Sequence, residues 1–190
     1  MIPQWNMQGV LPPIRPGSKG HELDRSPYQV PLTSVVERFA KTKERIQIVE
    51  GFLNYRQALY DVGINSGFQW LDGSFMEEIE QLESRPPNDV DVVTFFHLPP
   101  GMDQQQLAQK HGNLFLAKET KSRFRVDGYP FILGGPTASH NIKLISYWYS
   151  MWSHRRSGLW KGFIQVDLSP SEDATAVAAL ALIQQEGAHP

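Results

Sequence analysis

Two periods of apolar and polar positions divide the chain into helical and extended regions. Apolar residues recur at helical spacing within 34–39, from about 42 to 62 and within 139–153. Shorter runs rich in β-branched and aromatic residues predict strands, namely "FQWLDG", "DVDVVTFF", "SRFRVDGYPFIL" and "GFIQVDL". Cap residues set the helix ends: a capping box at Ser34 and Glu37, Pro170 at the start of the last helix and Gly187 at its end.

The order of these regions indicates the fold class. Two further short helices are expected at 75–84 and 103–112, between the strand candidates. Mixed helix and strand regions predict an α+β or α/β-like fold, with a small mixed sheet of about four strands flanked by helices. Residues 1–31 contain six prolines and no sustained period, so we expect an extended arm packed on a single domain of residues 32–190.

Composition limits the classes of function. A length of 190 residues predicts one domain, and the net charge of −2 gives no general attraction to nucleic acid or membranes. The absence of cysteine excludes disulfides, thiolate catalysis and cysteine-based zinc sites. No apolar run approaches the ~18 residues of a membrane span, and the N-terminus lacks a signal-peptide pattern. The expected location is the cytoplasm, away from membranes.

The segment "NDVDVV" carries the first candidate chemistry. In a strand, Asp89 and Asp91 point to one face while Val90 and Val92 point to the other. Two neighbouring carboxylates repel each other unless a cation lies between them, and Mg²⁺ binds one or two carboxylates together with water and phosphate oxygens. A phosphoryl-transfer site is therefore one interpretation; a solvated turn capped by Asp89 is the other.

Asp127 lies in another strand candidate and would complete a three-acid cluster if the two strands were neighbours. It also fits an Asp-Gly turn in "VDGY". Upstream, Gly73 would let a phosphate approach the backbone, and the Ser74 hydroxyl with the first amides of the following helix would hold its oxygens. Asp72 could be the acid near the serine, but its position directly before Gly-Ser favours a role in supporting that turn.

These motifs together resemble a known superfamily. Leu71 to Ser74, then Asp89 to Val92, then Asp127 follow a pattern similar to the nucleotidyltransferases related to DNA polymerase beta. The framing segments "RSPYQVPL", "GFQWLDGSF", "NDVDVVTFF" and "RRSGLWKG" resemble a family of small prokaryotic proteins of minimal nucleotidyltransferase type, over most of the chain.

The resemblance implies roles for individual residues. Asp89, Asp91 and Asp127 would hold Mg²⁺ or Mn²⁺, with Asp127 also activating the acceptor, and Gly73 with Ser74 would bind the terminal phosphates of an NTP. In a cluster of basic residues at 154–161, Arg156 and Lys161 would neutralise the triphosphate. Four glutamates, Glu77, Glu78, Glu80 and Glu83, occupy the 14 residues between Ser74 and Asp89, and they must face away from such a site.

The implied activity is transfer of an NMP from an NTP to a hydroxyl of a protein, RNA or small molecule. The resemblance also implies a role in a toxin-antitoxin or phage-defence module, with a neighbouring partner protein. A homo-oligomer is a further possibility. The alternative function is a catalytically silent binding module or antitoxin-like partner of the same fold. Direct nucleic-acid binding is a third possibility, disfavoured by the net charge.

Overall fold

The structure is a computed structural model of the chain, and it describes residues 1–134 and 139–186. The described α-helices are α1 (Leu32–Phe39), α2 (Lys43–Asp61), α3 (Ile79–Glu83), α4 (Gln104–His111), α5 (Ala117–Phe124), α6 (Ser139–Trp152) and α7 (Pro170–Glu186). Two 3₁₀ turns, η1 (Ser74–Met76) and η2 (Gly112–Phe115), accompany them. The strands are β1 (Tyr28–Gln29), β2 (Gly67–Asp72), β3 (Val90–Phe96), β4 (Val126–Ile132) and β5 (Ile164–Asp167).

The strands form one mixed sheet in the order β1-β5-β2-β3-β4. The central strand β2 is antiparallel to both neighbours, whereas β3 and β4 are parallel, as are β1 and β5. The prediction of an α+β fold is therefore confirmed. The described residues contain five strands rather than the expected four, because the end of the proline-rich arm adds β1 beside β5.

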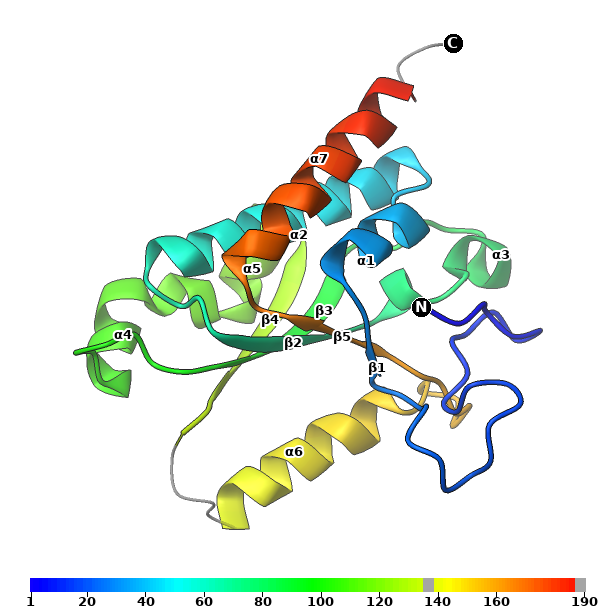
Figure 1. Cartoon of the computed structure of the whole chain (residues 1–190), viewed down its shortest axis with the longest axis horizontal. Coiled ribbons are helices and arrows are strands. Elements are labelled where there is room, and N and C mark those ends of the chain that lie inside the picture. Colours follow the sequence, from blue (N-terminus) through cyan, green and yellow to red (C-terminus); the bar gives the residue numbers. More distant parts are fainter. Residues whose placement is uncertain (135–138, 187–190) are drawn as a thin grey trace.

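Helices cover both faces of the sheet, as Figure 1 shows: α1, α2, α5 and α7 lie on one face and α6 on the other. Along each strand, the side chains of successive residues point alternately toward one layer of helices and toward the other. In β3, Val90, Val92 and Phe96 belong to the core beneath the helical layer, while Val93 and Phe95 pack toward Trp152 of α6. This alternation decides which face each polar strand residue occupies.

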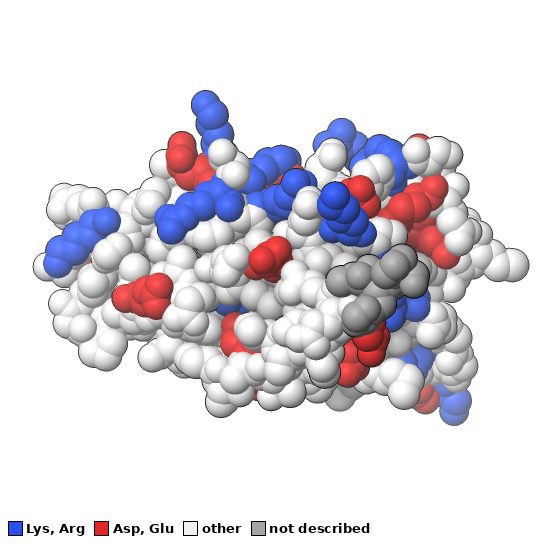
Figure 2. Space-filling view, turned by 90° about the horizontal axis from the view of Figure 1, so that it is seen from above, with Lys and Arg blue, Asp and Glu red and all other residues white. Residues whose placement is uncertain are grey.

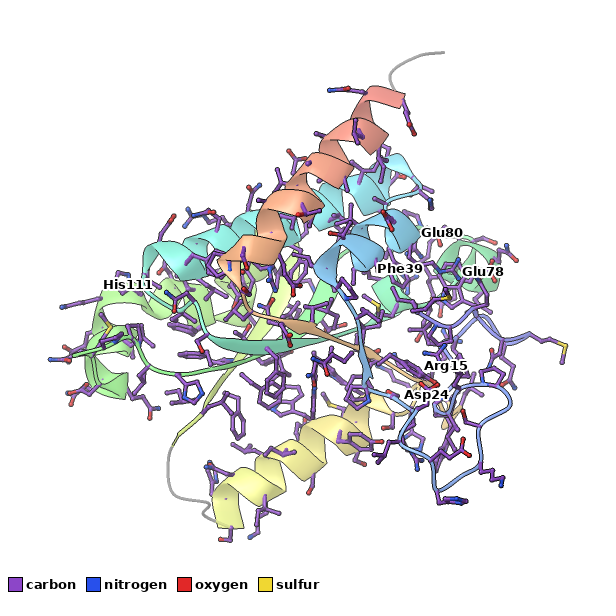
Figure 3. The ribbon with its side chains drawn as sticks, viewed as in Figure 1. Arg15, Asp24, Phe39, Glu78, Glu80 and His111 are labelled. Atoms are coloured by element: carbon purple, nitrogen blue, oxygen red, sulfur yellow. The ribbon has the colours of Figure 1, made fainter. Side chains whose placement is uncertain are left out.

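Residues of the N-terminal arm lie against this core. Ile2, Val10 and Leu11 are buried. An ion pair between Arg15 and Asp24 closes the loop that follows, with Nε and Oδ2 2.5 Å apart, and Figure 3 shows the two side chains pointing toward each other. The Tyr28 hydroxyl donates to the Pro12 carbonyl across 2.7 Å. The arm thus contributes both buried apolar surface and hydrogen bonds.

A buried arginine joins the helical layer to the sheet. Arg56 of α2 is fully buried; it lies 2.6 Å from Asp173 Oδ1 of α7 and donates to Gln69 Oε1 of β2, also at 2.6 Å. The Tyr60 hydroxyl completes the environment of Asp173 at 2.9 Å. Since a buried charge without a partner is strongly destabilising, these contacts fix α7 against α2.

Three expected boundaries were wrong. Helix α1 begins at Leu32, before the proposed capping box, because Pro31 already has the φ of −60° that precedes a helix. The strand candidate starting at Ser122 is helical up to Phe124, which packs on the Tyr55 ring, and β4 begins only after Arg125 reverses the chain with a φ of 55°.

The single helix expected at 75–84 is instead η1 followed by α3. Glu77 has extended backbone angles between them, and its carboxylate turns to Lys161. Helices α2, α4, α6 and α7 occur where helices were expected, whereas α5 was not expected; Gly187 lies outside the described residues.

None of the helices described combines the length and apolar character that crossing a membrane would require. Seen from above, Lys and Arg side chains are interspersed with Asp and Glu on a largely uncharged surface (Figure 2). On this face neither sign of charge forms a continuous surface, which matches the small net charge.

Candidate functional site

Three strands bring their acidic residues to one end of the sheet. The register places Asp72 of β2 opposite Asp91 of β3, and Asp91 beside Asp127 of β4. Each aspartate alternates with residues of the helix-side core, so all three face the layer of α6. Asp89 precedes β3 by one residue and, two positions before Asp91, shares its face.

The acids line a cavity of about 760 Å³, closed on its other side by the end of α6 and the segment after it. Its lining includes every residue proposed from the sequence: Gly73, Ser74, Asp89, Asp91, Asp127, Arg156 and Lys161. Positions up to 88 residues apart in the chain, from Gly73 to Lys161, therefore meet in one concave site.

The structure shows why position 73 requires glycine, a reason that the sequence did not indicate. Its φ of 85° is a left-handed conformation, and a Cβ at this position would overlap the Asp91 Oδ2 atom. The glycine therefore lets the Asp91 carboxylate lie against the β2 backbone. A helix was expected to follow Ser74 and to offer its first amides to a phosphate. The structure has instead the short turn η1, which comprises only Ser74–Met76.

A chain of buried ion pairs forms one wall of the cavity. Lys161 is only 5 % exposed, and its Nζ lies 2.9 Å from Asp72 Oδ1 and 3.1 Å from Glu77 Oε1. Arg155 continues the chain, 3.1 Å from Glu77 Oε2 and 2.6 Å from Glu83 Oε1. Lys161 thus lies in the cavity lining as expected, but its ammonium group is already shared by two carboxylates.

Two of the acids, Asp91 and Asp72, have raised pKa values. Burial, followed by the negative charges of Asp89 and Asp127, raises the pKa of Asp91 to about 6 against the opposing effect of Lys161 and Lys121. Burial also raises the pKa of Asp72 to about 7 against the opposing effect of Lys161. For Lys161, burial lowers the pKa, but Asp72 and Glu77 together outweigh it, so the pKa is raised overall. The site concentrates negative charge that the protein neutralises only in part.

Lys121 of α5 meets the acids from the open side of the cavity. Its Nζ contacts Asp89 Oδ2 and lies 3.7 Å from Asp127 Oδ2. Hydrogen bonding to Asp89 raises the pKa of this lysine above its ordinary value. One ammonium group therefore joins carboxylates from two neighbouring strands.

The donor atoms suit a hard divalent cation. Among the described residues, buried Asp127 Oδ1 has no hydrogen-bond partner, and Asp89 Oδ2 is contacted by the ammonium group of Lys121. Mg²⁺ needs one or two carboxylates, since water and phosphate oxygens fill its remaining positions, so Asp89 and Asp91 are sufficient. Across the described part of the chain, no three His, Asp or Glu side chains are assembled as metal ligands, and a three-acid cluster stays a prediction.

The glutamates between Ser74 and Asp89 divide into two groups. Glu78 and Glu80 line a different, smaller pocket beside Phe39, as expected of acids that face away (Figure 3). Glu77 and Glu83 line the main cavity, so for them the expectation was wrong. Their charges are met by Lys161 and Arg155, which removes much of their repulsion toward an anionic ligand.

Arg156 differs from the other basic residues of the lining. It is exposed, and it forms none of the ion pairs found among the described residues. It is therefore the cation most available to an incoming anion. His154 stands beside it in the lining, its ring edge-on to that of Trp160.

Sequence reasoning missed Lys121, Glu77 and the position of Asp72 in the site. Asp72 does have a sequence signal, because it is the last residue of a strand that runs into Gly-Ser. Lys121 and Glu77 have none, since each reaches the site only through the packing of α5 or the break at Glu77.

Fold and site together define an α+β protein with an acid-lined cavity at one end of a mixed sheet. The chain belongs to the family of unknown function DUF6932, which matches residues 3–167. This span contains all the cavity-lining residues discussed above and ends before α7 begins. Comparison with curated proteins and with solved structures gives no match.

Proposed function

We propose that the protein is a Mg²⁺-dependent nucleotidyltransferase of the type related to DNA polymerase beta. The observation that carries the proposal is the convergence of Asp89, Asp91 and Asp127 from two parallel strands on a cavity that also contains the Gly73–Ser74 turn. A cavity of about 760 Å³ is large enough for a nucleotide.

The proposed reaction transfers an NMP. A hydroxyl oxygen of the acceptor attacks the α-phosphorus of the NTP, the bond to the β-phosphate oxygen breaks, and pyrophosphate leaves with the bonding electrons. Asp127 accepts the hydroxyl proton, and the Ser74 hydroxyl and Arg156 hold phosphate oxygens. Mg²⁺ or Mn²⁺, bound by Asp89 and Asp91, would supply charge neutralisation for the phosphates.

The acceptor is a hydroxyl of a protein, RNA or small molecule, and a toxin-antitoxin or phage-defence role belongs to the same proposal. A chain of 190 residues leaves little surface beside the cavity to hold a large acceptor. A macromolecular acceptor, or a neighbouring partner protein, would therefore complete the site from outside.

The test uses NTPs labelled at different phosphates. The full chain is incubated with α-labelled or γ-labelled NTP, Mg²⁺ or Mn²⁺ and a cell lysate, beside Asp89→Asn/Asp91→Asn and a surface control, Asp61→Asn. We expect transfer of the α-label alone by the wild type and the control, and none by the double variant. Transfer of the γ-label would indicate a kinase, and absence of both transfer and metal-dependent NTP binding would contradict the proposal.

A second candidate is a catalytically silent binding module of the same fold. It is favoured by the ion pairs that already occupy Lys161, Arg155 and Lys121, because an enzyme needs some of these cations for its substrate. NTP binding without transfer to any acceptor, unchanged in the double variant, would support this candidate instead.

A further inference from the structure

Lys121 differs in one respect from the other ion-paired cations of the cavity. Lys161 is buried in a fixed network, and the side chain of Arg155 is 24 % exposed, whereas that of Lys121 is 53 % exposed. It reaches the acids from helix α5, and the residue as a whole is exposed. An exposed lysine has many rotamers, so it can leave the acids without disturbing the core.

The two acids that Lys121 joins are unlike an ordinary surface ion pair. The side chains of Asp89 and Asp127 are 13 % and 20 % exposed. Asp89 lies two residues before Asp91 in the chain, and Asp127 of β4 lies beside Asp91 of β3. Carboxylates this close need a cation, because their mutual repulsion is little screened when they are partly buried. The ammonium group of Lys121 supplies that charge in the protein by itself.

A divalent cation and this ammonium group compete for the same oxygen. A metal ion bound to Asp89 Oδ2 would lie within contact distance of the position that Lys121 Nζ holds. Two positive centres at that separation repel strongly in a partly buried site. Occupation by the metal therefore requires the lysine to move.

We propose that Lys121 is an exchangeable internal cation, which holds Asp89 and Asp127 together in the metal-free protein and is displaced when a divalent metal binds. The inference rests on the metal-binding part of the proposed function. It gives the site a regulatory property: the affinity for metal is set by competition with a lysine of the same chain. Neutralising that lysine, by substitution or by acetylation, strengthens metal binding.

The first experiment measures Mn²⁺ binding by titration calorimetry on the full chain, without nucleotide. The variants are Lys121→Met, which removes the charge and keeps the length, Lys121→Arg, which keeps the charge, and Lys118→Met. Lys118 is the matched control, because it is an exposed lysine of the same helix and forms no ion pair among the described residues. We expect Lys121→Met to bind Mn²⁺ about tenfold more tightly than the other three proteins, as loss of one nearby positive charge implies.

The second experiment separates displacement from a general effect of charge. An amine-acetylating reagent is applied with and without saturating Mn²⁺, and modification of each lysine is measured by peptide mass spectrometry. Release from Asp89 should increase the acetylation of Lys121 on metal binding, while Lys118 stays unchanged.

The outcomes distinguish the inference from the proposed function. The role of Lys121 is overturned if the wild type and Lys121→Met bind Mn²⁺ with equal affinity, or if the acetylation of Lys121 is the same with and without Mn²⁺. Either result is still compatible with the proposed metal site. Absence of Mn²⁺ binding in all four proteins overturns the metal site as well. Circular dichroism of each variant establishes that the comparison is made between folded proteins.

Discussion

Replacing Asp91 by asparagine should stabilise the metal-free protein above neutral pH. Burial and the charges of Asp89 and Asp127 raise the pKa of this carboxyl to about 6, compared with about 3.9 in an unfolded chain. At 1.36 kcal/mol per pKa unit, ionised Asp91 destabilises the fold by about 2–3 kcal/mol, and neutral asparagine of the same shape removes that penalty.

The sign of the pH dependence follows from the raised pKa. An acid whose pKa is higher in the folded state contributes fully to stability below its unfolded pKa, and that contribution is lost as the pH rises through the folded pKa. The free energy of unfolding of Asp91→Asn, minus that of the wild type, should therefore be near zero at about pH 3 and rise to its full value by about pH 7. Taking the difference cancels the titration of groups that both proteins share.

Urea unfolding followed by tryptophan fluorescence, with a chelator present, measures this difference. Asp61→Asn is the control, because Asp61 is an exposed residue of α2 whose carboxylate accepts one side-chain hydrogen bond among the described residues, from Gln57. Its difference curve should be flat. A flat curve for Asp91→Asn, or a loss of stability at pH 8, would refute the idea that the acids are crowded and incompletely neutralised.

Three further variants test the packing around the site by urea unfolding. Gly73→Ala should lose about 2 kcal/mol or more, because alanine is strained at this φ and its Cβ overlaps the Asp91 carboxylate; unchanged stability would mean that the turn adapts. Lys161→Met should lose about 3–5 kcal/mol at pH 8 and less at pH 5, because burial raises the pKa of its partner Asp72 to about 7 and this carboxyl is neutral at pH 5; an equal loss at both would contradict this. Arg56→Met should lose about 3–5 kcal/mol, part of it recovered by adding Asp173→Leu, and no recovery would argue against an unpaired buried charge as the cause.

At the start of β3, the sequence pattern places some residues of the site and leaves another to the fold. The alternation of aspartate and valine in "DVDVV" was enough to place Asp89 and Asp91 on one face and the valines in the core. It could not tell which strand lies beside β3, and that neighbour decides whether Asp127 is near. In the structure β3 pairs in parallel with β4, and the register places Asp127 directly beside Asp91.

The boundaries that were missed share a physical cause. The segment before Asp127 contains residues that suit either helix or strand, and it is helical because Phe124 packs on Tyr55 of α2. Similarly, the glutamate-rich segment after Ser74 has good helix propensity, but the helix breaks at Glu77, where the carboxylate gains a buried ion pair. Tertiary contacts outweigh local preference in both places.

The sequence by itself determined the α+β class, most of the helices and strands, and the residue types that line the site, because hydrophobic period and cap residues act locally along the chain. Tertiary structure alone decided that Asp72 joins the acids, that Lys161 is buried between two carboxylates and that Lys121 holds Asp89 and Asp127. These relations depend on Coulomb interactions between side chains distant in sequence, whose strength is set by burial and separation in the folded protein.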